Sequence, residues 1–252
     1  IILPENCKGE NYTIGEKAFS NCTELKAITI PGTVTDIDIL AFYHCTALES
    51  IIVETGNPRY DSRENCNAII ETATNTIVLG CKNTTIPNSI TSIGDYAFND
   101  CSSFTEIEIP NSITNLGSSV FSGCSNLSSV KLPATISSIP VNAFQNCAIT
   151  SITIPEGVTE LEWGAFEGCS KLETVELPST LSVIESYAFS GCSSLKEITI
   201  PNSVNTIQDY AFGGCSSLTE ITIPDGIESI AEATFQRCSG LTSIVIPNSV
   251  RS

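Results

Sequence analysis

Hydrophobic residues follow one pattern that recurs along the whole chain, and the segment Leu218–Ile223 shows it clearly. Leu218, Ile221 and Ile223 give the spacing LxxIxI, whose second half alternates apolar and polar residues. Such alternation predicts a strand with one buried face. Pro224 ends this strand, and the Asp-Gly pair that follows it predicts a turn.

The remaining apolar positions of the unit predict the rest of a coil. Ile227 and Ile230 turn back toward the core on the return path, where we expect a second short strand. Residues 209–212 precede the next Cys and predict a single helical turn, with Ala211 and Phe212 pointing inward. The unit is too short to hold a longer helix as well.

A repeated Phe gives the length of the unit. Nine such residues, each three positions before a Cys, are separated by 23 residues, apart from one gap of 56 and one of 22. They are Phe19, Phe42, Phe98, Phe121, Phe144, Phe166, Phe189, Phe212 and Phe235. A period of 23 lies in the range of leucine-rich repeats, and one unit cannot bury its apolar residues without stacked neighbours. We therefore predict an α/β leucine-rich-repeat solenoid, strand-rich, with a curved parallel β-sheet and with second short strands and single helical turns on its convex side.

The repeats predict a single leucine-rich-repeat domain over residues 1–252, with two irregular portions. The first is the N-terminal portion at 1–16. The second is a long coil at 54–85, where apolar runs at 67–71 and 76–80 flank a polar connection and predict a hairpin. The last unit, beginning at Pro247, is incomplete, so we expect the chain to be a fragment of a longer protein.

Charge excludes two classes of partner. The chain has 28 acidic and 11 basic residues, a formal net charge of −17. A field of this sign repels nucleic acid and anionic lipid, and no basic cluster reverses it locally. No apolar window reaches the roughly 20 residues of a membrane-spanning helix. We expect no direct membrane insertion of this segment.

Twelve cysteines raise the question of a disulfide framework. Nine of them mark the repeat: Cys22, Cys45, Cys101, Cys124, Cys147, Cys169, Cys192, Cys215 and Cys238. Equivalent Cβ atoms of stacked coils stay about 4.8 Å apart, beyond the ~3.8 Å usual in disulfides, so we predict buried, reduced thiols. Cys66 and Cys81 lie at the open end of the predicted hairpin, and either a disulfide or two thiols fits them. Cys7 has no assignable partner.

Other chemistry is sparse. His44 stands next to Cys45, but neighbours in sequence point in different directions, so a surface turn residue is expected instead of a catalytic dyad. A spacing of 23 between cysteines and a single His do not suit zinc. Trp163 is expected to pack over Phe166. We predict no enzyme activity, no metal and no cofactor.

Short motifs carry a resemblance to a known family. Ile-Pro-Asn-Ser-Val at 200–204, Ala-Phe at 211–212, Gly-Cys-Ser-Ser-Leu at 214–218 and Glu-Ile-Thr-Ile-Pro at 220–224 resemble the BspA-like leucine-rich repeats. The resemblance implies a large surface or secreted protein of a host-associated microbe, acting in adhesion to matrix proteins or other cells. It supplies no catalytic residues, and it leaves the ligand open.

The outward positions of the predicted strands give a candidate site for a protein or glycan ligand on the concave face. The candidate ligand-binding residues are Glu106, Glu108, Lys131, Thr153, Glu176, Glu197, Thr199, Glu220 and Thr222. Carboxylates on consecutive coils favour a basic protein segment, and the long coil around Arg59, Tyr60 and Arg63 is the second candidate. The alternative is a passive spacer that projects another domain from the cell surface.

Overall fold

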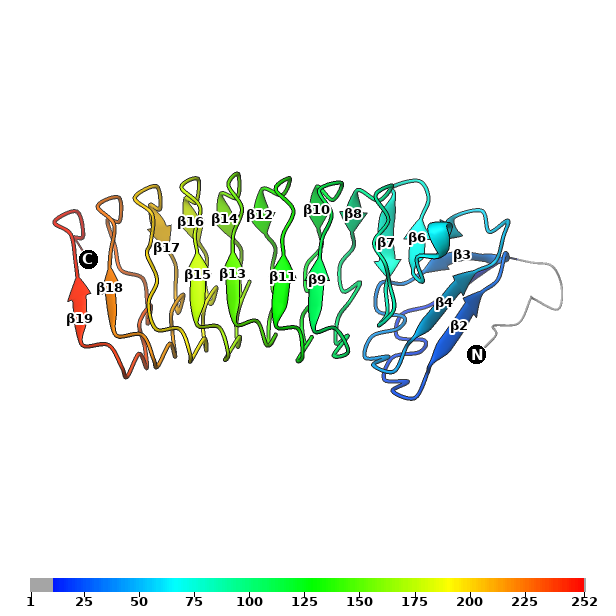
Figure 1. The fold of residues 1–252 in the computed structure, drawn as a ribbon, viewed down its shortest axis with the longest axis horizontal. Helices are drawn as coiled ribbons and strands as arrows, with labels where there is room; N and C mark the ends of the chain where they lie inside the picture. The colour runs from blue at the N-terminus through cyan, green and yellow to red at the C-terminus, as the bar shows by residue number, and fades with distance from the viewer. Residues whose placement is uncertain (1–10, 252) are drawn as a thin grey trace.

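The coils stack in chain order along one long axis, as the computed structural model shows for residues 11–251 (Figure 1). Cys7 and most of the irregular N-terminal portion lie outside the described residues. Most coils contribute one strand to a front row and one strand, usually shorter, to a return row. The two rows give a strand-rich solenoid, as the sequence predicts.

The front row contains the strands of the LxxIxI pattern. They are β2 (Ala27–Ile30), β4 (Ser50–Val53), β9 (Glu106–Glu108), β11 (Ser129–Lys131), β13 (Ser151–Thr153), β15 (Thr174–Glu176), β18 (Glu220–Thr222) and β19 (Ser243–Val245). Neighbours pair in parallel as β2–β4, β9–β11, β13–β15 and β18–β19. Their central residues point into the core and the flanking residues point outward, because side chains alternate along a strand.

The return row contains the second short strands. They are β1 (Tyr12–Ile14), β3 (Val34–Ile37), β8 (Ser92–Ile93), β10 (Asn115–Leu116), β12 (Ser138–Ile139), β14 (Glu160–Leu161), β16 (Val183–Ile184) and β17 (Thr206–Ile207). The strands β12, β14, β16 and β17 form one continuous parallel sheet. The predicted second strands are therefore present in most coils, but the segment around Ile227 and Ile230, for which the sequence also predicts one, is not a strand.

The predicted helical turns are absent, which corrects the sequence-based expectation. Around Phe212, backbone N–H groups alternate between two kinds of partner. Those of Tyr210, Phe212 and Gly214 donate to carbonyls of the following coil, at 3.0, 3.0 and 2.7 Å. Those of Ala211, Gly213 and Cys215 close turns within their own coil. An α-helix would need every N–H for its own i−4 carbonyl, so half of the amides are unavailable to it.

Left-handed residues accompany this alternation. Tyr210 has φ of 56° and Gly214 has φ of 76°, and the equivalent residues of other coils are also left-handed. Among residues 11–251 the only helix is a 3₁₀ turn, η1 (Arg63–Asn65). No helix in this part of the chain is long and apolar enough to cross a membrane.

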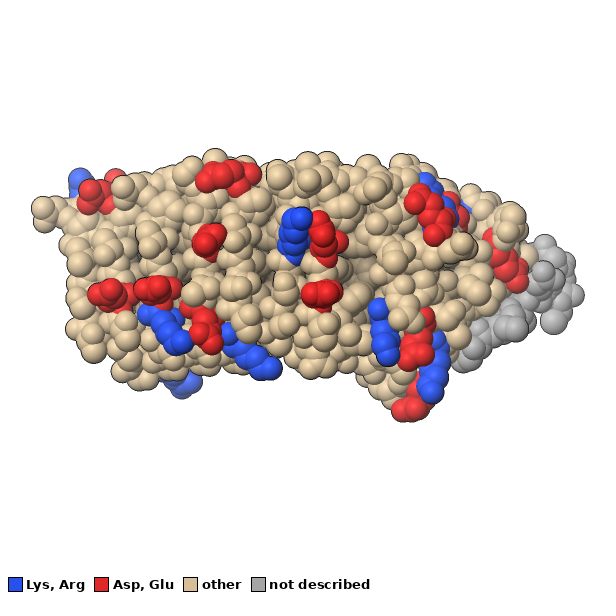
Figure 2. Space-filling view, viewed as in Figure 1, with Lys and Arg blue, Asp and Glu red and all other residues tan. Residues whose placement is uncertain are grey.

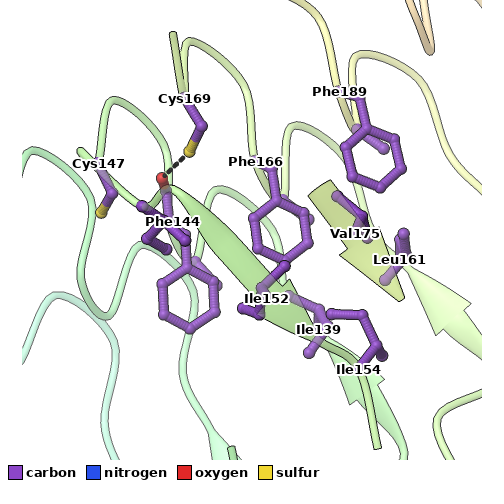
Figure 3. Packing of buried hydrophobic residues seen from close by; sticks show 14 of the residues in the cluster. Ile139, Phe144, Cys147, Ile152, Ile154, Leu161, Phe166, Cys169, Val175 and Phe189 are labelled. Atoms are coloured by element: carbon purple, nitrogen blue, oxygen red, sulfur yellow. Dashed lines mark hydrogen bonds between the residues drawn. The ribbon is translucent and has the colours of Figure 1, made fainter. Parts of the chain in front are cut away.

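The core is a column of stacked rings inside the coils. Phe98, Phe121, Phe144, Phe166, Phe189 and Phe212 are fully buried, and consecutive rings lie 5.4–5.6 Å apart between centroids. Inward Ile, Leu and Val side chains of both strand rows pack beside the rings (Figure 3). The sequence pattern thus correctly identifies the buried rings in the middle of the stack, whereas Phe19 and Phe235 are only half-buried.

The long coil forms the predicted hairpin and interrupts the column. Strands β6 (Ile69–Glu71) and β7 (Thr76–Leu79) are antiparallel, and β5 (Tyr60–Asp61) adds a third strand at the side of β6. β7 then pairs in parallel with β8 and joins the return row. The N–H of Gly80 donates to the Ala97 carbonyl, the bond that Phe makes in regular coils, so Gly80 takes the place of a Phe.

Gly80 is covered by the Phe98 ring, because a Cβ at this position would lie 2.0 Å from a ring carbon. The hydrophobic core is consequently divided in two. A small N-terminal core includes Phe42, Ile69 and Cys81, and the main core includes Cys66, Ile70 and all the coils from Phe98 onward. The hairpin contributes residues to both.

Candidate binding surface

Outward side chains of the front row form two parallel rows, which we call the strand face. The first row is Ala27, Ser50, Glu106, Ser129, Ser151, Thr174, Glu197, Glu220 and Ser243, and the second is Thr29, Ile52, Glu108, Lys131, Thr153, Glu176, Thr199, Thr222 and Val245. Strand register places equivalent residues opposite each other within each pair, for example Glu106 opposite Ser129 and Glu220 opposite Ser243. The predicted alignment is therefore correct wherever strands pair.

Some charges on this face are neutralised by their neighbours. The Lys131 ammonium lies 2.6 Å from the Glu108 carboxylate one coil away. The Thr153 hydroxyl donates to Glu176 over 2.9 Å. Figure 2 shows that acidic side chains are spread over the strand face and that few basic side chains accompany them.

Three carboxylates of the strand face have no such partner. Glu106, Glu197 and Glu220 are exposed, and none forms a side-chain hydrogen bond or an ion pair with another described residue. They are available to a ligand without first breaking an internal contact. Glu197 and Glu220 occupy the same row on consecutive coils.

Backbone pairing along the strand face is discontinuous, which the sequence did not predict. No strand pairing joins β11 to β13, and the segment 197–200 is not a strand although it has the LxxIxI pattern. Between Glu197 and Ile200 no backbone group is hydrogen-bonded to another described residue. The front row is thus split at this segment and between β11 and β13.

Shallow hollows lie at these interruptions. Hollow A, of about 420 Å³, spans the break between β11 and β13, with Lys131, Thr153 and Glu176 in its wall. Hollow B, of about 600 Å³, lies between β15 and residues 197–199. Hollow C, of about 400 Å³, extends from residues 197–202 across β18 to β19. Hollows B and C share Glu197 and Thr199.

The repeat cysteines form a column of thiols beside the rings. The structure buries Cys124, Cys147, Cys169, Cys192 and Cys215, as predicted, and half-buries Cys22, Cys45, Cys101 and Cys238. Each regular thiol donates to the Phe carbonyl of the preceding coil, for example Cys169 to Phe144 over 3.0 Å (Figure 3). Burial raises the pKa of the Cys169 thiol to about 12 and that of Cys45 to about 11. All eleven described cysteines are free thiols.

Cys66 and Cys81 do not form the disulfide that the hairpin allows. Both are buried free thiols. Cys66 belongs to the main core and Cys81 to the N-terminal core, so their side chains face different clusters. The Cys81 sulfur instead accepts a hydrogen bond of 3.2 Å from the Asn67 amide.

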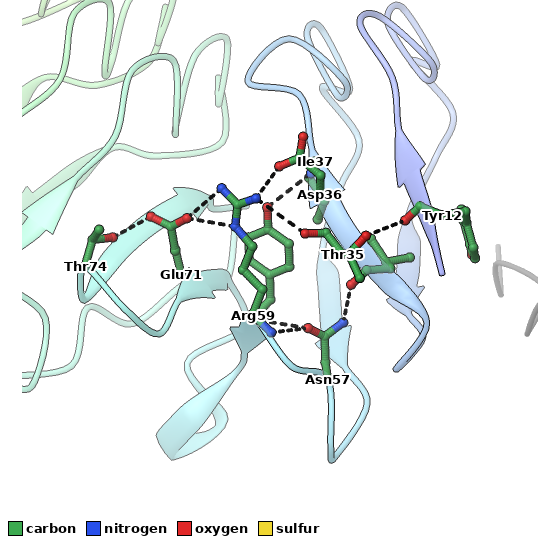
Figure 4. A network of polar contacts seen from close by, with 10 residues as sticks. Tyr12, Thr35, Asp36, Ile37, Asn57, Arg59, Glu71 and Thr74 are labelled. Atoms are coloured by element: carbon green, nitrogen blue, oxygen red, sulfur yellow. Dashed lines mark hydrogen bonds and ion pairs between the residues drawn. The ribbon is translucent and has the colours of Figure 1, made fainter. Parts of the chain in front are cut away.

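The second candidate surface, around Arg59, is occupied by internal contacts (Figure 4). The Arg59 guanidinium pairs with Asp36 of β3 and, over 2.8 Å, with Glu71 of β6. Arg63 pairs with Asp61 over 2.8 Å. Arg59 links the long coil to the preceding repeat and Arg63 is bound within the long coil, which leaves the strand face as the better candidate.

Neither His44 nor Trp163 contributes to a catalytic arrangement. His44 adopts a left-handed conformation in a turn, and its Nδ1 lies 3.0 Å from the Asp100 carboxylate. Trp163 is 39% exposed and contacts Tyr187, with 5.4 Å between ring centroids, so its expected packing over Phe166 is replaced by a neighbour in the next coil. The described residues contain no group of three or more His, Cys, Asp or Glu side chains placed to hold a metal.

Comparison with known protein families identifies the family to which this repeat architecture belongs. The model of the BspA type leucine-rich repeat region matches residues 1–76, 63–173 and 159–252. The chain belongs to the BspA-type leucine-rich repeat family. No curated protein sequence matches it. Solenoids of stacked repeats present extended binding surfaces, so the family assignment indicates a repeat-built interaction module.

Two solved structures are similar to this family member. A leucine-rich repeat protein from Eubacterium ventriosum is 25% identical with a TM-score of 0.67, and the match covers 85% of this chain and 64% of that protein. A leucine-rich cell surface protein from Faecalibacterium prausnitzii is 27% identical with a TM-score of 0.65, covering 82% and 58% respectively. The chain thus spans less than two thirds of the length of either relative.

Proposed function

We propose that this chain is a binding module of a surface or secreted protein, that it acts in adhesion, and that it holds a protein partner on its strand face. The observation that carries the proposal is the pair of outward rows, on which unpartnered Glu197 and Glu220 stand on consecutive coils. A catalytic role has no comparable support in the described residues.

Rigidity of the surface favours binding. The outward side chains are mostly Ser, Thr and Glu, and their coils, including the unpaired segment 197–200, enclose the buried ring column. A partner therefore meets groups that are already positioned, and little conformational entropy is lost on association. The net charge of −17 adds long-range attraction for a basic partner and speeds its association.

Placement at the surface is supported by similarity. The family match covers the whole chain, and the Faecalibacterium prausnitzii relative is described as a cell surface protein. We infer the same placement for this chain. The partner we expect is an extracellular matrix protein or a component of another cell surface.

The test is a triple variant, Glu176→Ser, Glu197→Ser and Glu220→Ser, measured for binding to matrix proteins and to whole cells at low and physiological salt. We expect weaker binding, with the largest loss at low salt because exposed charges are less screened there. The matched control, Glu24→Ser, Asp225→Ser and Glu228→Ser, changes the charge equally with exposed residues outside the strand face.

Two results contradict the proposal. If the folded triple variant binds as well as the parent at low salt, the strand face is not the site. If the parent binds nothing in these assays, the passive spacer becomes the better interpretation. Circular dichroism of both variants checks that their fold is unchanged.

A further inference from the structure

Hollows B and C are adjacent and acidic, and they sit where the front row lacks backbone pairing. Hollow B is walled by Glu156, Glu176 and Glu197, and hollow C by Glu197 and Glu220. No Lys or Arg lines either hollow. The adjacent basic side chain, Lys196, is already paired with Glu173 over 2.8 Å.

Hollow A differs in its charge. Lys131 and Glu176 both line it, and Lys131 is paired with Glu108, so a basic group entering hollow A meets charges of both signs. Hollows B and C, in contrast, are lined by acidic side chains without a basic one. Charge complementarity there selects a basic occupant.

The segment shared by hollows B and C has unpartnered backbone groups. Ile198, which belongs to the main core and is 8% exposed, lines both hollows. The carbonyls of residues 197–200 accept no hydrogen bond from a described residue. An ammonium or guanidinium group donates several hydrogen bonds, so these carbonyls and the carboxylates can be satisfied by one side chain.

The distance between hollows B and C indicates how far apart the basic side chains of the occupant lie. Hollow B lies between β15 and residues 197–199, and hollow C is centred on β18, so their centres are one and a half coils apart. The rings of these coils repeat at 5.5–5.7 Å, so one and a half coils correspond to about 8 Å, and residues i and i+2 of an extended chain, whose side chains point the same way, are about 6.7 Å apart. Alternate side chains of an extended segment therefore match the two hollows.

We propose that the partner presents an extended segment running across the strands, with two basic side chains two residues apart. One enters hollow B beside Glu176 and Glu197, and the other enters hollow C beside Glu197 and Glu220. Glu197 belongs to both hollows and contacts both basic groups. This inference rests on the proposed function of the strand face and adds the chemistry and the register of the partner.

The experiment uses three labelled peptides of equal composition in fluorescence anisotropy titrations with the 252-residue chain. Their central sequences are Ser-Lys-Ser-Lys-Ser, Ser-Lys-Lys-Ser-Ser and Lys-Ser-Ser-Ser-Lys, which place the lysines two, one and four residues apart. We expect the first to bind about threefold to fivefold more tightly than the others, the size that one additional exposed charge pair gives. Glu197→Gln is expected to remove the preference, and Glu106→Gln, which neutralises an unpartnered carboxylate of the same row outside the hollows, is expected to retain it.

The outcomes separate the inference from the function on which it rests. Equal binding of the three peptides, weakened equally by Glu197→Gln, overturns the register while leaving the strand face as a site for cations. Failure of all three peptides, with matrix-protein binding that still depends on the strand face, also overturns the inference alone. If no binding depends on the strand face, both are wrong.

Discussion

Removal of a ring from the middle of the phenylalanine column tests the stacked-coil architecture directly. Phe189 is fully buried, and its ring lies 5.6 Å from Phe166 and 5.5 Å from Phe212. Phe189→Ala loses the transfer free energy of the ring, about 1.5–3 kcal/mol, and leaves a cavity between two rings held by their own coils. We expect a total loss of about 3–5 kcal/mol in the free energy of unfolding.

Phe235 provides the comparison. It is only half-buried, and its sole stacked neighbour among the described rings is Phe212, at 5.7 Å. Less surface is buried and one wall of the site is open, so Phe235→Ala is expected to lose about 1–2 kcal/mol. Phe189→Leu keeps most of the apolar volume and is expected to lose less than about 1.5 kcal/mol.

Urea denaturation followed by circular dichroism and by fluorescence measures these differences. Trp163 is the only tryptophan of the chain and contacts Tyr187, so its emission reports on the coils around Phe189. Equal losses for Phe189→Ala and Phe235→Ala would refute the reasoning, because a column of stacked rings cannot be equally sensitive in its interior and at its last ring.

Three further results are expected. Gly80→Ala places a Cβ against the Phe98 ring and should destabilise the chain by about 1–3 kcal/mol, whereas Gly32→Ala meets no atom within 4 Å and should be near neutral in the same urea titration. At about pH 8 the buried native thiols should resist alkylation, since burial raises the pKa of Cys169 to about 12. Mass mapping after unfolding without reductant should find at least nine free thiols. Disulfides between coils would contradict this expectation. The pKa of Glu71 is lowered by the Thr74 hydroxyl and by Arg59, so the carboxylate stabilises the fold above its unfolded pKa, and this stabilisation is lost as pH falls through the lower folded pKa. Glu71→Gln should therefore flatten the fall in melting temperature below about pH 4.5. An unchanged slope would contradict this expectation.

Periodicity predicted the architecture because the same interaction recurs in every coil. The inward Ile and Phe residues, the strand register and the hairpin of the long coil follow from which residues must be buried. The turns after the return row were missed, although a signal is present. Asn and Gly tolerate a left-handed backbone, and they fill the position two residues after Phe in most coils, as Asn21, Gly123 and Gly191 do.

The interruptions of the front row could not be predicted from local sequence. Residues 195–200 read LKEITI and residues 218–223 read LTEITI, yet only the second segment contains a strand. Pairing depends on how closely two coils approach, and this is set by the whole stack. At the break between β11 and β13 the chain gives a partial indication, because the spacing from Phe144 to Phe166 is 22 residues. Hollows B and C, at the other break, have no such indication.

The division of the hydrophobic core determines which part of the molecule can persist by itself. Solenoid repeats need about three stacked units to become stable, and the N-terminal core has rings from only two, Phe19 and Phe42. Ile69 and Cys81 of the long coil provide the missing layer. The long coil therefore stabilises the two repeats before it. Deletion of the long coil is expected to unfold those two repeats while the main core stays folded.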